Sequence, residues 1–95
     1  MQSYYVYILR CADDSYYIGH SDNLEGRLVA HQQKLLPCYT NTRLPVQLVF
    51  VQEFGTRDEA FAGERKLKGW SRKKKEALIN EKHELLRIYS KKNFL

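Results

Sequence analysis

The 95-residue sequence has only two cysteines and two prolines, and it has no long apolar run. Cys11 and Cys38 lack CxxC spacing and are too few for a disulfide framework or a zinc site, so we expect reduced thiols. No segment approaches the length of a membrane span, and the N-terminus lacks the basic and apolar regions of a secretory signal. These absences predict a soluble, cytoplasmic protein.

Internal repeats, low-complexity tracts and a Pro/Gly-rich linker are also missing. A chain this short buries only a modest fraction of its unfolded surface, so we expect a single domain over residues 1–95. Its core should span about 3–80, followed by a C-terminal helical extension at 81–95. Basic charge is plentiful, because sixteen Lys and Arg against eleven Asp and Glu give a net charge of +5. That excess favours polyanionic partners such as nucleic acid or an acidic membrane surface.

The first third of the chain contains signals for two strands and a helix. Residues 3–10 and 15–20 are rich in Tyr, Val and Ile and flank the polar stretch ADDS, which is the pattern of two strands and a tight connection. Asp22 followed by Glu25 is a capping-box arrangement. Leucines then recur at helical spacing, so a helix is predicted to run as far as Pro37.

The rest of the chain adds one strand and two helices. Residues 37–45 should form a loop bounded by two prolines, and the β-branched and aromatic stretch 46–54 a third, more buried strand. A capping box at Thr56 and Glu59 opens a second helix, and Ser71 caps a third. The order β-β-α-β-α-α predicts an α+β fold: a small three-stranded, mainly antiparallel sheet flanked by helices.

The loop between the first two strands decides whether two tyrosines share a face of the sheet. A two-residue loop, Asp13 and Asp14, would put Tyr7 and Tyr17 on opposite faces, whereas a three-residue loop puts them together. The longer loop gives the better segregation: Tyr5, Tyr7, Leu9, Tyr17 and Gly19 on one face, and Val6, Ile8 and Ile18 on the other. We therefore predict a bulged type I turn with positive φ at Asp14, and a gap above Gly19, which lies across from Tyr7.

These residues resemble the signature of the GIY-YIG nucleases. The triplets YVY (5–7) and YIG (17–19), separated by nine residues, look like a variant of that signature. Arg27 and His31 match the family's helical arginine and histidine, and Glu64 matches its metal-binding glutamate. The resemblance extends over roughly the first 80 residues, and the pattern is similar to that of the small stand-alone, single-domain subfamily.

The resemblance implies a metal-dependent endonuclease that hydrolyses DNA phosphodiester bonds, with DNA repair or recombination as its setting. The implied catalytic residues are Tyr7, Tyr17, Arg27, His31 and Glu64. Tyr7 and Tyr17 would lie near the attacking water, Arg27 on the phosphate, and His31 in proton transfer or positioning. Glu64 is the implied ligand of a divalent metal, Mg²⁺ or alternatively Mn²⁺. Neither a membrane partner nor a small-molecule cofactor is expected.

Two positions depart from the family pattern. Tyr5 stands where the family often has glycine. The asparagine that many members carry beyond the metal glutamate has no clear counterpart, since Glu76 lies near its expected place and Asn80 is a loose candidate. The alternative function is therefore a nucleic-acid-binding module of the same fold with weak or no cleavage. A third interpretation is a protein-interaction adaptor that uses the tyrosine face.

Each catalytic candidate also has a plainer interpretation. His31 falls inside the leucine stripe of its helix and could be a core histidine bonded to the backbone. Arg27 could be a solvated ion-pair partner, and Glu64 could pair with Lys68 at i,i+4 in water. The nuclease interpretation accounts for all of these residues together, whereas the plainer ones need a separate coincidence for each.

Basic residues gather in the run RKLKGWSRKKK, residues 65–75. Such a run is typical of a solvated surface, and it also suits neutralisation of DNA phosphates, with Trp70 as a face for base stacking. The predicted nucleic-acid-binding residues are Arg43, Lys68, Trp70, Arg72, Lys73 and Lys74. No base-reading element is recognisable, so the form of the DNA (duplex, branched or single-stranded) stays open.

Overall fold

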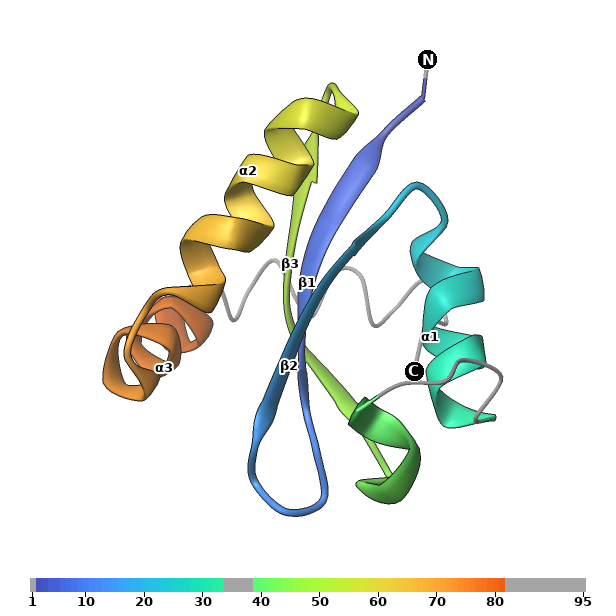
Figure 1. Ribbon diagram of the computed structural model, residues 1–95, viewed down its shortest axis with the longest axis vertical. Helices are drawn as coiled ribbons and strands as arrows, with labels where there is room; N and C mark the ends of the chain where they lie inside the picture. The colour runs from blue at the N-terminus through green and yellow to red at the C-terminus, as the bar shows by residue number, and fades with distance from the viewer. Residues whose placement is uncertain (1, 34–38, 82–95) are drawn as a thin grey trace.

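The computed structural model describes residues 2–33 and 39–81, which form a three-stranded sheet with helices on both faces (Figure 1). The strands are β1 (Tyr4–Arg10), β2 (Tyr16–Ser21) and β3 (Gln47–Phe54), and the helices are α1 (Leu24–Gln32), α2 (Arg57–Lys68) and α3 (Arg72–Glu81). A 3-10 helix, η1 (Tyr39–Thr42), precedes β3. This order confirms the predicted α+β fold. The predicted extension after residue 81 lies outside the described residues.

Strand β1 is the central strand of the described sheet. It pairs antiparallel with β2 on one side and with β3 on the other. One face carries a buried cluster that includes Tyr7 and Leu9 of β1 together with Leu24 and Leu28 of α1. The opposite face packs against α2 and α3. The sheet is therefore the middle of three layers, and β2 forms one edge (Figure 1).

The hairpin between β1 and β2 has the predicted register. Tyr7 lies opposite Gly19, and Leu9 lies opposite Tyr17, so Tyr7 and Tyr17 share the α1 face. The turn is closed by a hydrogen bond from Asp14 N to Cys11 O, 2.9 Å, and Asp14 has a φ of 67°. Aspartate adopts this left-handed region at lower cost than most residues. The predicted three-residue loop with positive φ at Asp14 is confirmed.

Strand β3 is buried on both faces although it lies at a sheet edge. Leu48 to Val51 form an unbroken buried run, as predicted. An irregularity in the pairing between Ile8 and Leu9 of β1 places an extra residue in β3, so Val49 and Phe50 both join the α2 side of the sheet. A bulge of this kind explains why the strand lacks simple alternation of apolar and polar residues.

The helix starts follow the capping predictions at two of three places. Thr56 Oγ1 accepts the Glu59 backbone N–H at the start of α2, and Ser71 Oγ accepts the Lys74 N–H at the start of α3. The predicted cap at Asp22 is wrong, because Asn23 is the N-cap of α1 and its Oδ1 accepts the Gly26 N–H. Helix α1 ends at Gln32, earlier than predicted.

Candidate active site

Three buried polar side chains form a hydrogen-bonded chain on the α1 face. Tyr7 Oη lies 3.0 Å from His31 Nε2, and His31 Nδ1 lies 2.9 Å from Thr40 Oγ1. All three residues have no exposed surface. Buried polar atoms of this kind need partners, and each imidazole nitrogen has one here. The chain links β1, α1 and η1, so the histidine ring is held from two sides.

Burial and a nearby charge keep the His31 ring neutral. Burial lowers the pKa of His31 below its ordinary value of 6.5, and the positive charge of Arg27, one turn earlier on α1, lowers it further. A neutral imidazole has one N–H donor and one acceptor nitrogen. One of the two hydroxyls, on Tyr7 or Thr40, therefore donates to the ring, and the other accepts from it.

Gly19 gives the Tyr7 ring the space it occupies. A Cβ atom built on residue 19 would lie 2.6 Å from Tyr7 Oη and 2.7 Å from Tyr7 Cζ. The predicted gap above this glycine thus exists, but the phenol of Tyr7 itself fills it. The glycine and the tyrosine of the signature are complementary in shape, because only a residue without a side chain allows this approach.

Tyr17 and Arg27 lie nearer the surface than Tyr7 and His31. Both are half-buried, and the Tyr17 ring meets the His31 ring edge-on with 5.0 Å between centroids. Within residues 2–33 and 39–81, no carboxylate lies within ion-pair distance of the Arg27 guanidinium. The plain interpretation of Arg27 as an ion-pair partner therefore has no support in this part of the chain. Its guanidinium can take an external anion.

Glu64 lies on the opposite face of the sheet from the tyrosine and histidine cluster. It is only 7% exposed, and α2 directs it toward β2. Its Oε1 lies 3.1 Å from His20 Nδ1, and its Oε2 lies 3.6 Å from Lys68 Nζ. The Lys68 pair is thus present as the plain interpretation expects, but the carboxylate is buried rather than solvated.

The donor atoms around Glu64 fit a divalent cation in part. Glu64 is a buried carboxylate, and such a group is costly without positive charge beside it. In the described part of the chain, no group of three or more His, Cys, Asp or Glu side chains gathers. One carboxylate with His20 beside it would leave most coordination positions to water and substrate oxygens, which Mg²⁺ tolerates.

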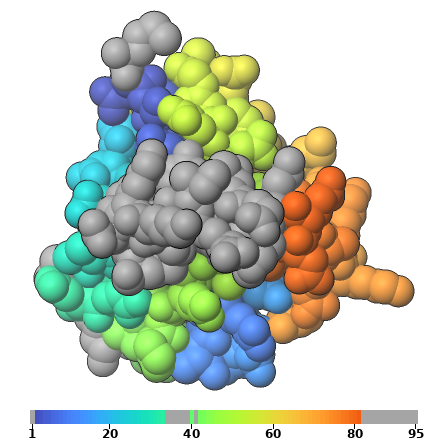
Figure 2. Space-filling model, turned by 180° about the vertical axis from the view of Figure 1, so that it is seen from behind, coloured from blue at the N-terminus to red at the C-terminus, as the bar shows by residue number. Residues whose placement is uncertain are grey.

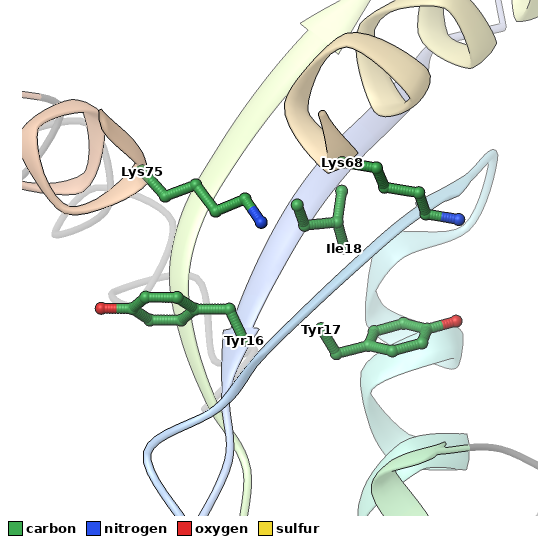
Figure 3. Close-up of a pocket in the computed structure, with 5 residues that line it drawn as sticks. All are labelled: Tyr16, Tyr17, Ile18, Lys68 and Lys75. Atoms are coloured by element: carbon green, nitrogen blue, oxygen red, sulfur yellow. The ribbon is translucent and has the colours of Figure 1, made fainter. Parts of the chain in front are cut away.

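A surface hollow of about 270 Å³ lies beside β2, which is an edge strand of the described sheet. It is lined by Tyr16, Tyr17, Ile18, Lys68 and Lys75. Tyr16 and Tyr17 leave β2 in opposite directions, while Lys75 reaches from α3 toward Ile18 (Figure 3). Tyr17 of the histidine cluster and Lys68, the ion-pair partner of Glu64, therefore border the same hollow.

The basic run divides between intramolecular contacts and open surface. Lys74 Nζ lies over the half-buried Trp70 ring at 4.2 Å from its centroid. Arg72 donates to Asp14 O at 2.6 Å and pairs with Glu76 at 3.4 Å. Lys73 is exposed. The Trp70 face predicted for base stacking is thus covered by a lysine side chain.

Arg43 lies beside the hairpin loop rather than beside the basic run. Its Nε donates to Asp13 Oδ2 at 3.0 Å, and its carbonyl accepts the Ala12 N–H at 2.9 Å. From the opposite side, Arg72 contacts the same loop. Figure 2 shows the loop between the segment that follows η1 and α3. The loop places the two arginines on one continuous surface.

The two candidates for the family asparagine do not line the hollow at β2. Glu76 and Asn80 line a separate depression of about 260 Å³ together with Arg10 and Tyr16. The structure therefore supplies no clear counterpart of the family asparagine at either position.

Sequence reasoning missed three residues at this site. Thr40 was part of a loop with no residue pattern to single it out, and only its contact with His31 reveals it. His20 follows the YIG triplet directly, so its place in the alternation of β2 could have assigned it to the Glu64 face. Lys75 was one of several lysines in the basic run, and only the packing of α3 selects it.

Thr40→Val should destabilise the fold at nearly constant side-chain volume. The change removes the Thr40 hydroxyl from buried His31 Nδ1, and the loss of a buried hydrogen bond of this kind costs about 1–3 kcal/mol. Urea denaturation measures the free energy of unfolding. Thr40→Ser is the matched control, since it keeps the hydroxyl and should retain more stability than Thr40→Val. Equal stability of Thr40→Val and wild type would contradict the importance of this hydrogen bond.

The chain matches a family model and several relatives over most of its length. The model described as the GIY-YIG catalytic domain matches residues 3–77. A UPF0213 protein of Staphylococcus saprophyticus is 41% identical over 81 residues, which cover 85% of this chain and 99% of the relative. A UPF0213 protein of Bacillus licheniformis is 44% identical over 80 residues, or 84% of this chain and 82% of the relative.

Two solution NMR structures resemble the fold. The UPF0213 protein BH0048 of Bacillus halodurans aligns with a TM-score of 0.57 and 38% identity, over 84% of this chain and 85% of that protein. The protein EF2693 of E. faecalis aligns with a TM-score of 0.60 and 34% identity, over 87% and 88% of the two chains. Among the helices described for this chain, none has the length and apolar character needed to span a membrane.

Proposed function

The chain belongs to the GIY-YIG catalytic-domain family, and on that premise we propose that it is a metal-dependent endonuclease that hydrolyses DNA phosphodiester bonds. One observation supports the proposal: the hollow beside β2, an edge strand of the described sheet, is bordered by Tyr17 and by Lys68, the partner of Glu64. In this proposal the Tyr17 phenol, the Arg27 guanidinium on α1 and the buried Glu64 carboxylate would act on one substrate bound at this edge. We place the activity in the cytoplasm, in DNA repair or recombination.

Tyr17 is the phenol that we assign to the attacking water. Tyr17 is half-buried and lines the hollow, whereas Tyr7 has no exposed surface. A proton acceptor must lie within hydrogen-bond reach of the water that it activates, and only Tyr17 of the two can meet a water from solvent without a rearrangement. We assign Tyr7 to the positioning of His31, since Tyr7 Oη lies 3.0 Å from His31 Nε2.

Arg27 and His31 complete the α1 side of the site. Arg27 would bind the scissile phosphate and stabilise the negative charge that develops on it during attack. His31 is locked between Tyr7 and Thr40, and the edge of its ring supports Tyr17. We therefore assign His31 to the positioning of Tyr17, with proton transfer restricted to the buried hydroxyls that it contacts.

Glu64 would hold the divalent cation from the α2 side. When bound, the cation supplies positive charge for the phosphate and for the leaving oxygen. Mg²⁺ suits a site with few protein ligands, and Mn²⁺ is the alternative. Lys68 Nζ lies 3.6 Å from the carboxylate, and its side chain is 57% exposed, so it is free to turn toward a DNA phosphate.

DNA would approach along β2, α2 and α3. Lys68 and Lys75 project into the hollow and would meet the phosphates next to the cleaved one. Arg72, Lys73 and Lys74 extend the positive surface along α3. We propose that Trp70 orients Lys66 and Lys74, which lie over its ring, and that Arg43 extends the surface beyond the hairpin loop.

The test is an assay of binding and cleavage on single-stranded, duplex and branched DNA. We expect cleavage of at least one form in Mg²⁺ and none in the presence of EDTA. Binding measured without metal should weaken with salt, with a slope of log K against log salt of about −3 to −4 if about four phosphates are contacted.

The alternatives give different results in the same assay. Salt-dependent binding without cleavage in Mg²⁺ or Mn²⁺ would support the binding module of the same fold. The positions of Glu76 and Asn80 outside the hollow favour that alternative. A slope near zero on every DNA would contradict both nucleic-acid functions. It would favour the protein-interaction adaptor.

A further inference from the structure

His20 and Glu64 face each other although 44 residues separate them in the sequence. His20 pairs with Val6 in the sheet, and Val6 belongs to the cluster packed under α2, so the imidazole leaves β2 on the α2 side. Its Nδ1 lies 3.1 Å from Glu64 Oε1. The ring of Phe61, one turn earlier on α2, meets the His20 ring edge-on at 5.8 Å and supports its orientation.

The distance between these two donor atoms also suits shared coordination of one ion. Two ligands about 2.1 Å from a metal and at right angles to each other lie about 3.0 Å apart. The 3.1 Å separation of His20 Nδ1 and Glu64 Oε1 is close to that value. A hydrogen bond between the two residues has the same length, so it keeps both side chains in nearly the same positions when no ion is bound.

We propose that His20 is a second protein ligand of the cation held by Glu64, so that the site offers one nitrogen and one carboxylate oxygen. The proposal rests on the metal role assigned to Glu64 under the proposed function and adds the chemical class of metal. Imidazole nitrogen suits divalent transition metals, whereas Mg²⁺ prefers oxygen ligands. The site therefore binds Mn²⁺ and Ni²⁺ more tightly than Mg²⁺, and His20 is the reason.

The surroundings of the pair allow an ion to enter. The His20 side chain is 29% exposed, so the pair is reached from the surface. Lys68 is the described cation closest to the carboxylate, and it contacts Oε2 rather than the Oε1 atom that faces His20. Displacement of the mostly exposed Lys68 side chain frees Oε2 without disturbing the core.

Titration calorimetry of the purified, untagged protein with Ni²⁺ and with Mg²⁺ tests the proposal without DNA or cleavage. His20→Asn places an amide N–H close to the position of Nδ1, so it keeps the hydrogen bond to Glu64 while removing the imidazole ligand. We expect Ni²⁺ affinity to fall at least about tenfold and Mg²⁺ affinity to change less than about threefold. Glu64→Gln should remove binding of both metals.

Asp58→Asn is the matched control, because it removes an acidic charge from the exposed first turn of the same helix. It should leave both affinities unchanged, and circular dichroism confirms that each variant is folded. Equal Ni²⁺ affinity in wild type and His20→Asn would overturn the role of His20. That result, together with Mg²⁺-dependent DNA cleavage that Glu64→Gln abolishes, would leave the proposed function intact. Retained cleavage in Glu64→Gln would instead overturn the proposed function.

Discussion

The Glu64→Gln variant is expected to bind DNA about as tightly as wild type and to cleave it about a thousandfold more slowly. Cleavage slows because metal-assisted charge stabilisation contributes several kcal/mol to lowering the barrier. Each contribution of about 1.4 kcal/mol corresponds to a factor of ten in rate. Binding survives because the proposed phosphate contacts come from Arg27, Lys68 and Lys75. The fold survives as well, since the amide is isosteric and a buried negative charge is removed.

Single-turnover cleavage in Mg²⁺ and fluorescence anisotropy in EDTA measure the two effects separately. Asp58→Asn is again the control, because it changes the net charge of α2 by the same amount at an exposed position. A folded Glu64→Gln protein that cleaves DNA at close to the wild-type rate would show that Glu64 does not hold the cation. The ion pair with Lys68 would then be the better account of this residue.

Gly19→Ala is expected to destabilise the fold by about 1–3 kcal/mol and to reduce cleavage. The new Cβ atom would meet Tyr7 Oη at 2.6 Å, Tyr7 Cζ at 2.7 Å and the Tyr17 ring at 3.1 Å. Tyr7 is fully buried and bonded to His31, so its ring has no open space into which it can retreat. Relief of the clash must move Tyr7 or the β2 backbone, and either movement disturbs the ring positions of Tyr17 and His31.

Gly69→Ala is the matched control for the same substitution elsewhere. Gly69 ends α2 with a φ of −84°, and a Cβ atom there would meet its nearest neighbour at an ordinary 3.5 Å. Urea denaturation should therefore show a clear loss of stability for Gly19→Ala and little change for Gly69→Ala. Equal midpoints for the two variants would refute the close packing of Tyr7 on Gly19.

Features that depend on local chemistry could be predicted from the amino-acid sequence. Segregation of phenolic and aliphatic side chains selected the three-residue hairpin loop, and with it positive φ at Asp14 and the pairing of Tyr7 with Gly19. The caps at Thr56 and Ser71 could be read because a cap uses side-chain and backbone groups only a few residues apart. The cap of α1 was assigned one residue too early, since Asp22 and Asn23 are both good caps and their local patterns compete.

The depth of each site residue and the groups that it faces depend on tertiary packing. Alternation along a strand assigns a side chain to a face, but its depth depends on which distant segments cover that face. Tyr7 and Tyr17 share the α1 face, yet Tyr7 is completely buried beside His31, which Thr40 also holds, while Tyr17 borders the hollow. The approach of His20 to Glu64 likewise arises from packing between β2 and α2, so no local pattern in the chain contains it.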